Sequence, residues 1–188
     1  MGEGATSPAQ REILALGALA LSRAIHAREL SCREVMDAYL AQIDAANPVV
    51  NAIVSRRDHE VLMDEAGECD RELAAGRSRG WLHGIPQAIK DLSATRDLPT
   101  SMGSPLFKGQ VPQQDGIMVR RMRDAGVILV GKTNTPEFGL GSQTYNRVFG
   151  ATRNAFDPSL CAGGSSGGAA AALAMRMLPV ADGSDMMG

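Results

Sequence analysis

The sequence predicts an α/β fold, in which N-terminal helices precede part of a mixed, largely parallel sheet covered by helices. Three observations lead to this prediction. Apolar residues recur at helical spacing through most of residues 1–80, the chain becomes rich in Gly and Pro after a polar break at Arg77–Gly80, and the apolar run Val127–Val130 directly follows a helical pattern. A length of 188 residues fits one hydrophobic core. We therefore expect residues 1–80 to form a helical segment of the same domain as residues 81–188.

Two helices are expected at the N-terminus. From Ile13 to Leu30, apolar residues recur about every three or four positions, which predicts one amphipathic helix. Ser31 and Glu34 have the Ser-x-x-Glu spacing of a capping box, in which hydroxyl and carboxylate accept hydrogen bonds from backbone N–H groups. We expect the second helix, which starts there, to stop near Asn47-Pro48.

The middle of the chain alternates strand and helix patterns. Asn51–Ser55 is short and partly β-branched, which indicates a strand, and His59–Ala75 is a charged helical segment that Gly76 should end. Ile85–Lys90 has the pattern of a buried strand that places Lys90 at its end.

The remaining segments continue the α/β pattern. Asp97–Gln114 is loop-rich, Asp115–Ala125 is helical, and Val127–Val130 is a strand. Ala169–Met177 predicts a helix entered from a glycine run, and Pro179–Ala181 predicts a further short strand.

Charge and composition exclude several classes of function. Lys and Arg total 19 against 21 Asp and Glu, so there is no basic excess to bind nucleic acid or an anionic membrane surface. The longest apolar stretch, Ile13–Leu21, is much shorter than the ~20 residues that span a bilayer. No signal peptide is recognised at the N-terminus.

The cysteines and histidines predict neither a disulfide framework nor a metal site. The three cysteines are odd in number and widely spaced, without a Cys-x-x-Cys pair, which fits a reducing cytoplasm: Cys32, Cys69 and Cys161. The three histidines lack metal-ligand spacing and are expected to be structural: His26, His59 and His83.

One segment has the formal spacing of a nucleotide-binding loop. Gly126–Thr133 matches Gly, four residues and Gly-Lys-Thr, so an NTPase has to be considered. A P-loop needs a flexible loop between strand and helix, whereas here the four variable positions form the predicted strand itself. Lys132 is then expected to be a solvated or structural residue at a strand edge.

The strongest local signal is the block Gly163–Gly168, which contains four glycines around two serines and leads directly into a helix. Such a backbone suits close approach of another group and unusual dihedral angles. Three interpretations compete: a flexible linker, an anion-binding loop, or a catalytic loop that holds a hydroxyl.

Three segments together resemble the amidase signature family. They are Gly84–Asp91, Gly131–Gly139 and Gly163–Gly168, in this order, and the resemblance extends from about residue 10 to the last residue. It implies an α/β fold of which this chain holds the first part. It also implies hydrolysis of carboxylic amides by a serine, a cis-serine and a lysine in place of a histidine.

The resemblance implies roles for individual residues. Lys90 matches the catalytic lysine, Ser165 matches the cis-serine joined to Gly164 by a cis peptide bond, and Ser166 matches a neighbouring serine with a supporting hydrogen-bond role. The glycines that shape this loop are Gly163, Gly164, Gly167 and Gly168.

The family's nucleophile lies in a block of the form Gly-Thr/Ser-Asp-x-Gly-Gly-Ser. Gly183–Gly188 matches this block up to, but not including, its last serine. We therefore expect the nucleophile to follow Gly188, and the chain to be a fragment, a cleaved protomer or a chain broken at this point.

The same block implies an oxyanion hole lined by the backbone N–H groups of Met186, Met187 and Gly188, with Asp185 in a structural role beside it. Met187 stands where a glycine is usual, which puts the geometry of that hole in question. Cys161 stands where a proline commonly precedes the glycine pair.

These residue types suit amide hydrolysis. A serine hydroxyl needs a base, and a lysine can serve as that base only when it is neutral, which requires a pKa well below the ordinary value of about 10.4. Burial at the end of the strand Ile85–Lys90 would lower it. Ser165 would pass the proton between the nucleophile and Lys90, and no cofactor is needed.

The expected partners are a small-molecule amide substrate and the remainder of the same protein, with a homodimer left open. One alternative within the family is the glutamine-hydrolysing subunit of a tRNA-dependent amidotransferase. Two alternatives from other classes are a P-loop nucleotide binder and an inactive fragment.

Overall fold

The computed structural model describes residues 6–186 and contains a three-stranded sheet in the order β1-β3-β2. Its strands are β1 (Ile53–Val54), β2 (Pro86–Lys90) and β3 (Ile128–Thr133). β2 and β3 run parallel while β1 is antiparallel to β3, so the sheet is mixed, as predicted. Lys90 lies opposite Thr133, which brings the carboxyl ends of β2 and β3 to the same edge.

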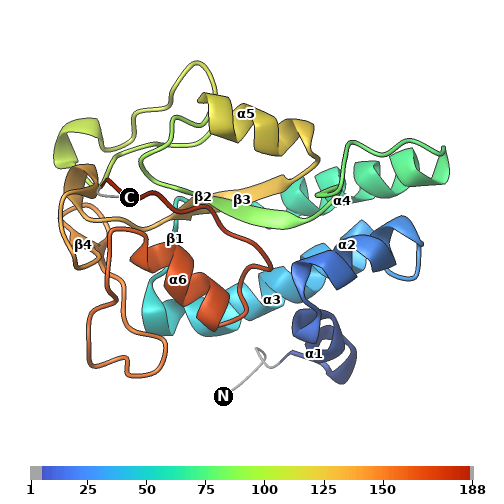
Figure 1. Cartoon of the computed structure of the whole chain (residues 1–188), viewed down its shortest axis with the longest axis horizontal. Coiled ribbons are helices and arrows are strands. Elements are labelled where there is room, and N and C mark those ends of the chain that lie inside the picture. The colour runs from blue at the N-terminus through green and yellow to red at the C-terminus, as the bar shows by residue number, and fades with distance from the viewer. Residues whose placement is uncertain (1–5, 187–188) are drawn as a thin grey trace.

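Helices cover both faces of the sheet (Figure 1). In that view α5 (Ile117–Asp124) lies above the strands, whereas α3 (Cys32–Val50) and α6 (Gly167–Ala174) lie below them. α4 (His59–Ala74) packs against α3 and β3. The core draws fully buried side chains from the N-terminal helices and from the strands alike, among them Leu21, Val35, Leu62, Ile89 and Leu129. Each such burial contributes about 1.5–3 kcal/mol.

The first predicted helix is wrong as a single element. It consists of α1 (Pro8–Ala15) and α2 (Ala18–His26), which are separated by an extended Leu16 and by Gly17 as the N-cap of α2. The break lets α1 fold back on α3 and bury Ile13. Tertiary packing therefore overrides a periodicity that is locally continuous.

The capping box at the start of α3 is confirmed, since Glu34 N–H donates to the Ser31 hydroxyl and the Glu34 carboxylate accepts from Ser31 N–H. The predicted end at Asn47-Pro48 is wrong, because α3 continues to Val50. Pro48 falls in the last turn, where it removes one N–H donor. The Asn47 side chain accepts from the N–H groups of Ala52 and Ile53 at 2.9 and 2.8 Å, which fixes the chain just beyond the helix.

The following elements match their predictions with small shifts of their ends. α4 ends at Ala74, two residues before Gly76, whose φ of +73° favours glycine. Residues 97–114 are loop apart from the short 3-10 helix η1 (Pro105–Phe107). Beyond β3 come a second 3-10 helix, η2 (Glu137–Gly139), and a small antiparallel pair, β4 (Tyr145–Asn146) and β5 (Gly150–Ala151).

The strand predicted at Pro179–Ala181 is wrong. No backbone hydrogen bond joins residues 179–181 to another described segment, so this apolar run does not form part of a sheet. A side chain makes the link instead: Lys90 N–H in β2 donates to the Asp182 carboxylate. Within residues 6–186, no helix combines the length and apolar character that crossing a membrane requires.

Candidate active site

Lys90 is the last residue of β2, and every residue of that strand is buried. Its side chain is 1% exposed. The amine Nζ donates to three serine hydroxyls, namely Ser165 at 2.7 Å, Ser166 at 2.8 Å and Ser184 at 2.9 Å. The buried strand thus delivers one amine to three hydroxyls that come from two later segments of the chain.

Ser165 and Ser166 lie in the loop that enters α6. The peptide bond between Gly164 and Ser165 is cis, as the resemblance implies. The Thr135 hydroxyl donates to the carbonyl of Ser165 at 3.2 Å, which ties this loop to the segment after β3. The loop that carries both serine hydroxyls is therefore fixed by a hydrogen bond to Thr135 as well as by its contacts with Lys90.

The glycine block permits close approach of other parts of the protein. A Cβ at Gly167 would lie 2.2 Å from the Thr144 hydroxyl oxygen, and one at Gly168 would lie 2.3 Å from the backbone nitrogen of Asn134. Gly164 is less crowded, with Thr144 Oγ1 at 3.1 Å from such a Cβ. The groups that approach this backbone include the protein's own chain, which argues against a flexible linker.

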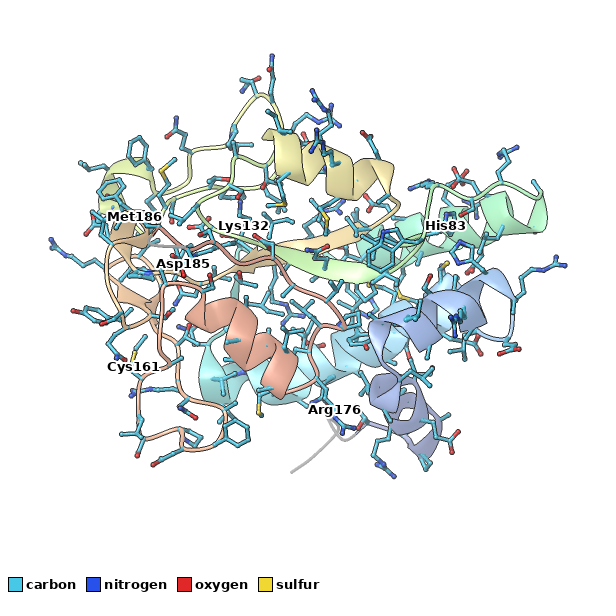
Figure 2. The ribbon with its side chains drawn as sticks, in the orientation of Figure 1. His83, Lys132, Cys161, Arg176, Asp185 and Met186 are labelled. Carbon is cyan, nitrogen blue, oxygen red and sulfur yellow. The ribbon has the colours of Figure 1, made fainter. Side chains whose placement is uncertain are left out.

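The last described segment completes this side of the site. Ser184 N–H donates to Ser166 Oγ at 3.2 Å, in addition to the contact of Ser184 with Lys90. Asp185 and Met186, both labelled in Figure 2, follow on the same segment, and Met186 is 80% exposed. Met187 and Gly188, which were expected to line an oxyanion hole, lie outside the described residues.

Two opposing electrostatic effects act on the pKa of Lys90. Burial lowers the pKa of its amine, while the carboxylates of Asp182 and Asp185 oppose that shift by stabilising the ammonium form. An ammonium donates all three of its hydrogens, as in the observed contacts. A neutral amine has a lone pair, so one of the three hydroxyls can donate to it instead.

Lys132 lies nearby in β3 and is fully buried. Its amine donates to the Ser93 carbonyl at 2.7 Å and to the hydroxyls of Thr95 at 2.8 Å and Thr100 at 3.0 Å. Burial lowers the pKa of Lys132 to about 8. Of the two alternatives expected for this lysine, the solvated one is wrong and the structural one holds.

The segment with the formal P-loop spacing lies mostly in a strand, as the sequence indicated. Ile128–Thr133 is strand β3, so the variable positions contribute to the sheet and not to a loop around a phosphate. Lys132 is also already surrounded by protein oxygens. This geometry gives no support to nucleotide binding at Gly126–Thr133.

Three residues in contact with the site were not predicted to take part. Ser184 lies within the Gly183–Gly188 block, but the sequence pattern assigned it no role. Thr135 bonds the cis-serine carbonyl, and Asp182 bonds the backbone of Lys90. Each of these residues lies among other polar residues, which is a weak sequence signal for a role in a site. The sequence does not show which of those polar residues contact one another in the folded chain.

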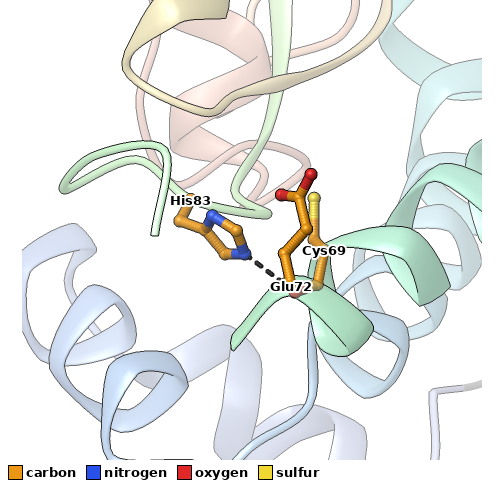
Figure 3. Close-up of side chains that lie close together, drawn as sticks. All are labelled: Cys69, Glu72 and His83. Carbon is orange, nitrogen blue, oxygen red and sulfur yellow. Dashed lines mark hydrogen bonds between the residues drawn. The ribbon is translucent and has the colours of Figure 1, made fainter. Parts of the chain in front are cut away.

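One cluster elsewhere has ligand types that metals use: Cys69, Glu72 and His83 (Figure 3). His83 Nδ1 accepts from Arg79 N–H at 3.1 Å, so the other ring nitrogen carries the hydrogen that points to the Cys69 carbonyl at 2.9 Å. Glu72 is paired with the Arg79 guanidinium. Both ring nitrogens are therefore engaged, and the geometry is that of a structural histidine.

A hollow of about 440 Å³ adjoins the serine loop. Gly163, Gly164 and Ser166 form one wall, and Ala170 and Phe156 belong to the rest of the lining. Acyl transfer requires a base, a hydroxyl within hydrogen-bond distance of it and a cavity for the substrate. Lys90, the serine hydroxyls and this hollow match these three requirements.

Comparison with known proteins gives a consistent result. A family model described as Amidase matches residues 34–188. A glutamyl-tRNA(Gln) amidotransferase subunit of Acidothermus cellulolyticus is 44% identical over 171 residues, which cover 91% of this chain and 34% of that protein. An acylamidase of Rhodococcus erythropolis is 40% identical over 173 residues, which cover 92% of this chain and 36% of that protein.

Solved structures agree with these sequence relatives. Fatty acid amide hydrolase superposes with a TM-score of 0.88 at 26% identity, covering 93% of this chain and 31% of its own. Peptide amidase from Stenotrophomonas maltophilia superposes with a TM-score of 0.81 at 35% identity, covering 89% and 35%. The chain spans about a third of the length of the curated relatives it matches.

Proposed function

The chain belongs to the amidase signature family, and from that premise we propose that it forms the part of an amidase that carries the proton relay. The reaction is hydrolysis of a carboxylic amide to an acid and ammonia or an amine. The observation that carries the proposal is the 2.7 Å contact between Lys90 Nζ and Ser165 Oγ, at the end of a buried strand.

The relay starts from a neutral Lys90. The nucleophilic serine, which we place directly after Gly188 in the uninterrupted protein, gives its proton to Ser165 Oγ while Ser165 gives its own to Lys90 Nζ. The serine oxygen attacks the amide carbonyl carbon. When the tetrahedral intermediate collapses, the C–N bond breaks and the nitrogen takes a proton back through Ser165, leaving an acyl-enzyme.

Water then completes the reaction. It gives a proton to the same relay, attacks the acyl carbon and releases the acid, while the nucleophile recovers its proton. No cofactor takes part in this scheme. In this scheme Ser166 holds Lys90 and Ser184 together, which is supported by its contacts to both.

The oxyanion hole belongs to the same proposal. Backbone N–H groups of Met186, Met187 and Gly188 receive the developing negative charge, with Asp185 supporting their loop. Removing one donor of an oxyanion hole typically costs about 3–4 kcal/mol of transition-state stabilisation. The glycines of Gly163–Gly168 keep the serine loop close to Lys90.

We place residues 1–80 and 81–188 in one domain, because buried side chains from both ranges share one core cluster. The cytoplasm is the proposed location, supported by three free cysteines. The proposed partners are a small amide substrate and the remainder of the same protein, and a homodimer is a further arrangement to test.

A second candidate is the glutamine-hydrolysing subunit of a tRNA-dependent amidotransferase. It is favoured by the 44% identity to the glutamyl-tRNA(Gln) amidotransferase protein of Acidothermus cellulolyticus. The two candidates differ in where the ammonia goes. Release of ammonia by the purified protein alone supports the amidase, and transfer to a product that forms only with partner subunits supports the second candidate.

A fluorophosphonate probe on the uninterrupted protein tests the relay. We expect label on the serine after Gly188, mapped by mass spectrometry, and strong loss of labelling in Lys90→Ala and Ser165→Ala. Lys108→Ala, which changes an exposed lysine, is the matched control. Label on Ser184 instead would reassign the nucleophile. Equal labelling after Lys90→Ala would overturn the proton relay. Failure of the uninterrupted protein to hydrolyse any amide would instead favour the inactive fragment.

A further inference from the structure

The end of β2 has an unusual backbone partner. β2 is an edge strand of the described sheet, and the N–H of Asp91, just after it, donates to the Thr133 carbonyl of β3. Because backbone directions alternate along a strand, the N–H of Lys90 points away from β3. There it donates to both carboxylate oxygens of Asp182, at 3.1 and 3.2 Å.

Asp182 belongs to the segment that also reaches the Lys90 amine. Two residues later, the Ser184 hydroxyl accepts from Lys90 Nζ at 2.9 Å. Gly183 lies between them, and a Cβ there would lie 3.4 Å from Ser166 Oγ. Residues 182–184 therefore hold Lys90 at both its backbone and its side chain, close against the serine loop.

The charge of Asp182 also acts on a second buried amine, that of Lys132. The carboxylates that act electrostatically on the Lys90 amine are those of Asp182 and Asp185, and those that act on the Lys132 amine are Asp91, Asp182 and Asp115. The direct contact of Asp182 in this region is with the Lys90 backbone N–H. Asp182 is the acidic residue common to both sets. Its charge stabilises two ammonium groups that burial otherwise disfavours.

We propose that Asp182 is a positioning residue that fixes the end of β2 to the segment carrying Ser184 and acts as the shared counter-ion of Lys90 and Lys132. Its catalytic consequence rests on the proposed function, whereas its electrostatic role does not. Burial raises the pKa of Asp182, while the Lys90 N–H and the two lysines oppose that shift and favour the carboxylate. The groups are thus mutually dependent.

The charge and the hydrogen bond of Asp182 can be separated by substitution. Asp182→Asn keeps a side-chain oxygen that can accept from Lys90 N–H but removes the negative charge. Asp182→Ala removes both. A residue that only caps the strand edge would tolerate Asn, whereas a counter-ion would not.

Lysine titration reads out the charge without any need for activity. The 188-residue sequence contains three lysines, Lys90, Lys108 and Lys132. In the uninterrupted protein labelled with ¹³C at lysine Cε, the signal that is lost in each Lys→Arg variant assigns these three residues. We expect the midpoints of Lys90 and Lys132 to move to lower pH in Asp182→Asn. Exposed Lys108 should not move, and Asp64→Asn, on the exposed side of α4, should move none of the three.

Hydrogen exchange reads out the bond. The Lys90 amide should exchange faster in Asp182→Ala and stay protected in Asp182→Asn. Unchanged midpoints of both Lys90 and Lys132 in Asp182→Asn would overturn the counter-ion role, and unchanged Lys90 exchange in Asp182→Ala would overturn the positioning role. If the alanine variant does not fold, the lysine titration of Asp182→Asn still tests the counter-ion role.

The pH profile of the uninterrupted protein connects this role to catalysis. We expect the acidic limb of kcat/KM to move to lower pH in Asp182→Asn, because Lys90 becomes neutral at lower pH. An active wild type with an unmoved limb contradicts the role of Asp182 in the reaction. An inactive wild type contradicts the proposed function instead and leaves the lysine titration as the test of the counter-ion.

Discussion

Lys90 is the last residue of β2 and Lys132 the second-to-last residue of the neighbouring parallel strand β3. Both side chains are buried, yet their surroundings differ in kind. The partners of Lys90 are three serine hydroxyls that lie 75 to 94 positions further along the chain. The partners of Lys132 are one carbonyl and two threonine hydroxyls of the loop just after β2, 32 to 39 positions away.

This difference matters for proton transfer. A hydroxyl can accept a hydrogen bond or donate one, so the partners of Lys90 suit an amine that alternates between ammonium and neutral forms. The Ser93 carbonyl can only accept, and the Thr95 hydroxyl already donates to that carbonyl at 2.9 Å. Two of the three partners of Lys132 are therefore fixed as acceptors. The chemistry of a buried lysine depends on whether its partners can return a proton.

The largest expected effect concerns Lys90. In the uninterrupted protein, Lys90→Met should lower kcat by about 10² to 10⁴-fold, the usual contribution of a general acid or base. Stability should change little, because water can reach exposed Ser184 and satisfy the freed hydroxyls. Steady-state kinetics and thermal unfolding measure the two effects, with Lys108→Met as control. Normal turnover would remove Lys90 from the mechanism.

Two glycines of the block Gly163–Gly168 allow a matched pair of substitutions. The pair tests whether close packing of this loop stabilises the fold around Lys90. Gly168→Ala places a Cβ 2.3 Å from the Asn134 nitrogen, whereas a Cβ at Gly163 meets nothing nearer than 4.0 Å. We expect Gly168→Ala to destabilise the fold by about 2–3 kcal/mol, as overpacking does, and Gly163→Ala to change it by less than about 0.5 kcal/mol. Chemical denaturation measures both. Equal stabilities would show that the close approach does not constrain this loop.

The comparison of the two lysines also separates what local sequence predicts from what it does not. The apolar runs Ile85–Lys90 and Val127–Val130 predict the two strands that carry these lysines, and the serine block with its glycines predicts the helix entry. Each signal lies within a few residues. The resemblance to a known family then indicated that Lys90 and Ser165 belong together.

Other features depend on contacts between distant segments. The break at Gly17 follows from α1 packing on α3, and the run Pro179–Ala181 forms no strand because its neighbour Lys90 is bound by a side chain. The burial of Lys132 depends on oxygens supplied by a separate loop. None of these partners is specified by the pattern around the residue itself.

Lys132→Met should lower stability more than activity, the opposite of what we expect for Lys90→Met. It leaves the Ser93 carbonyl and the hydroxyls of Thr95 and Thr100 without their donor, which should cost about 1–3 kcal/mol of stability. Because Lys132 has no part in the proposed relay, kcat should fall far less than in Lys90→Met. Urea unfolding and kinetics on the same preparations measure this. A loss of kcat equal to that of Lys90→Met, at unchanged stability, would contradict the division of roles.

The smallest expected effect is a pH dependence of stability that comes from Lys132. Its folded pKa is about 8, below the ordinary lysine value of about 10.4 in the unfolded chain, so the unfolded state binds more protons between these values. The free energy of unfolding must then rise with pH in that window. Between pH 8 and pH 9 the rise should be about 1 kcal/mol relative to Lys132→Met, in which all other titrating groups remain. Denaturation of both proteins at the two pH values measures it. A difference that stays constant, or that falls as pH rises, would mean that Lys132 is not desolvated in the folded protein and that its surroundings resemble those of an exposed lysine.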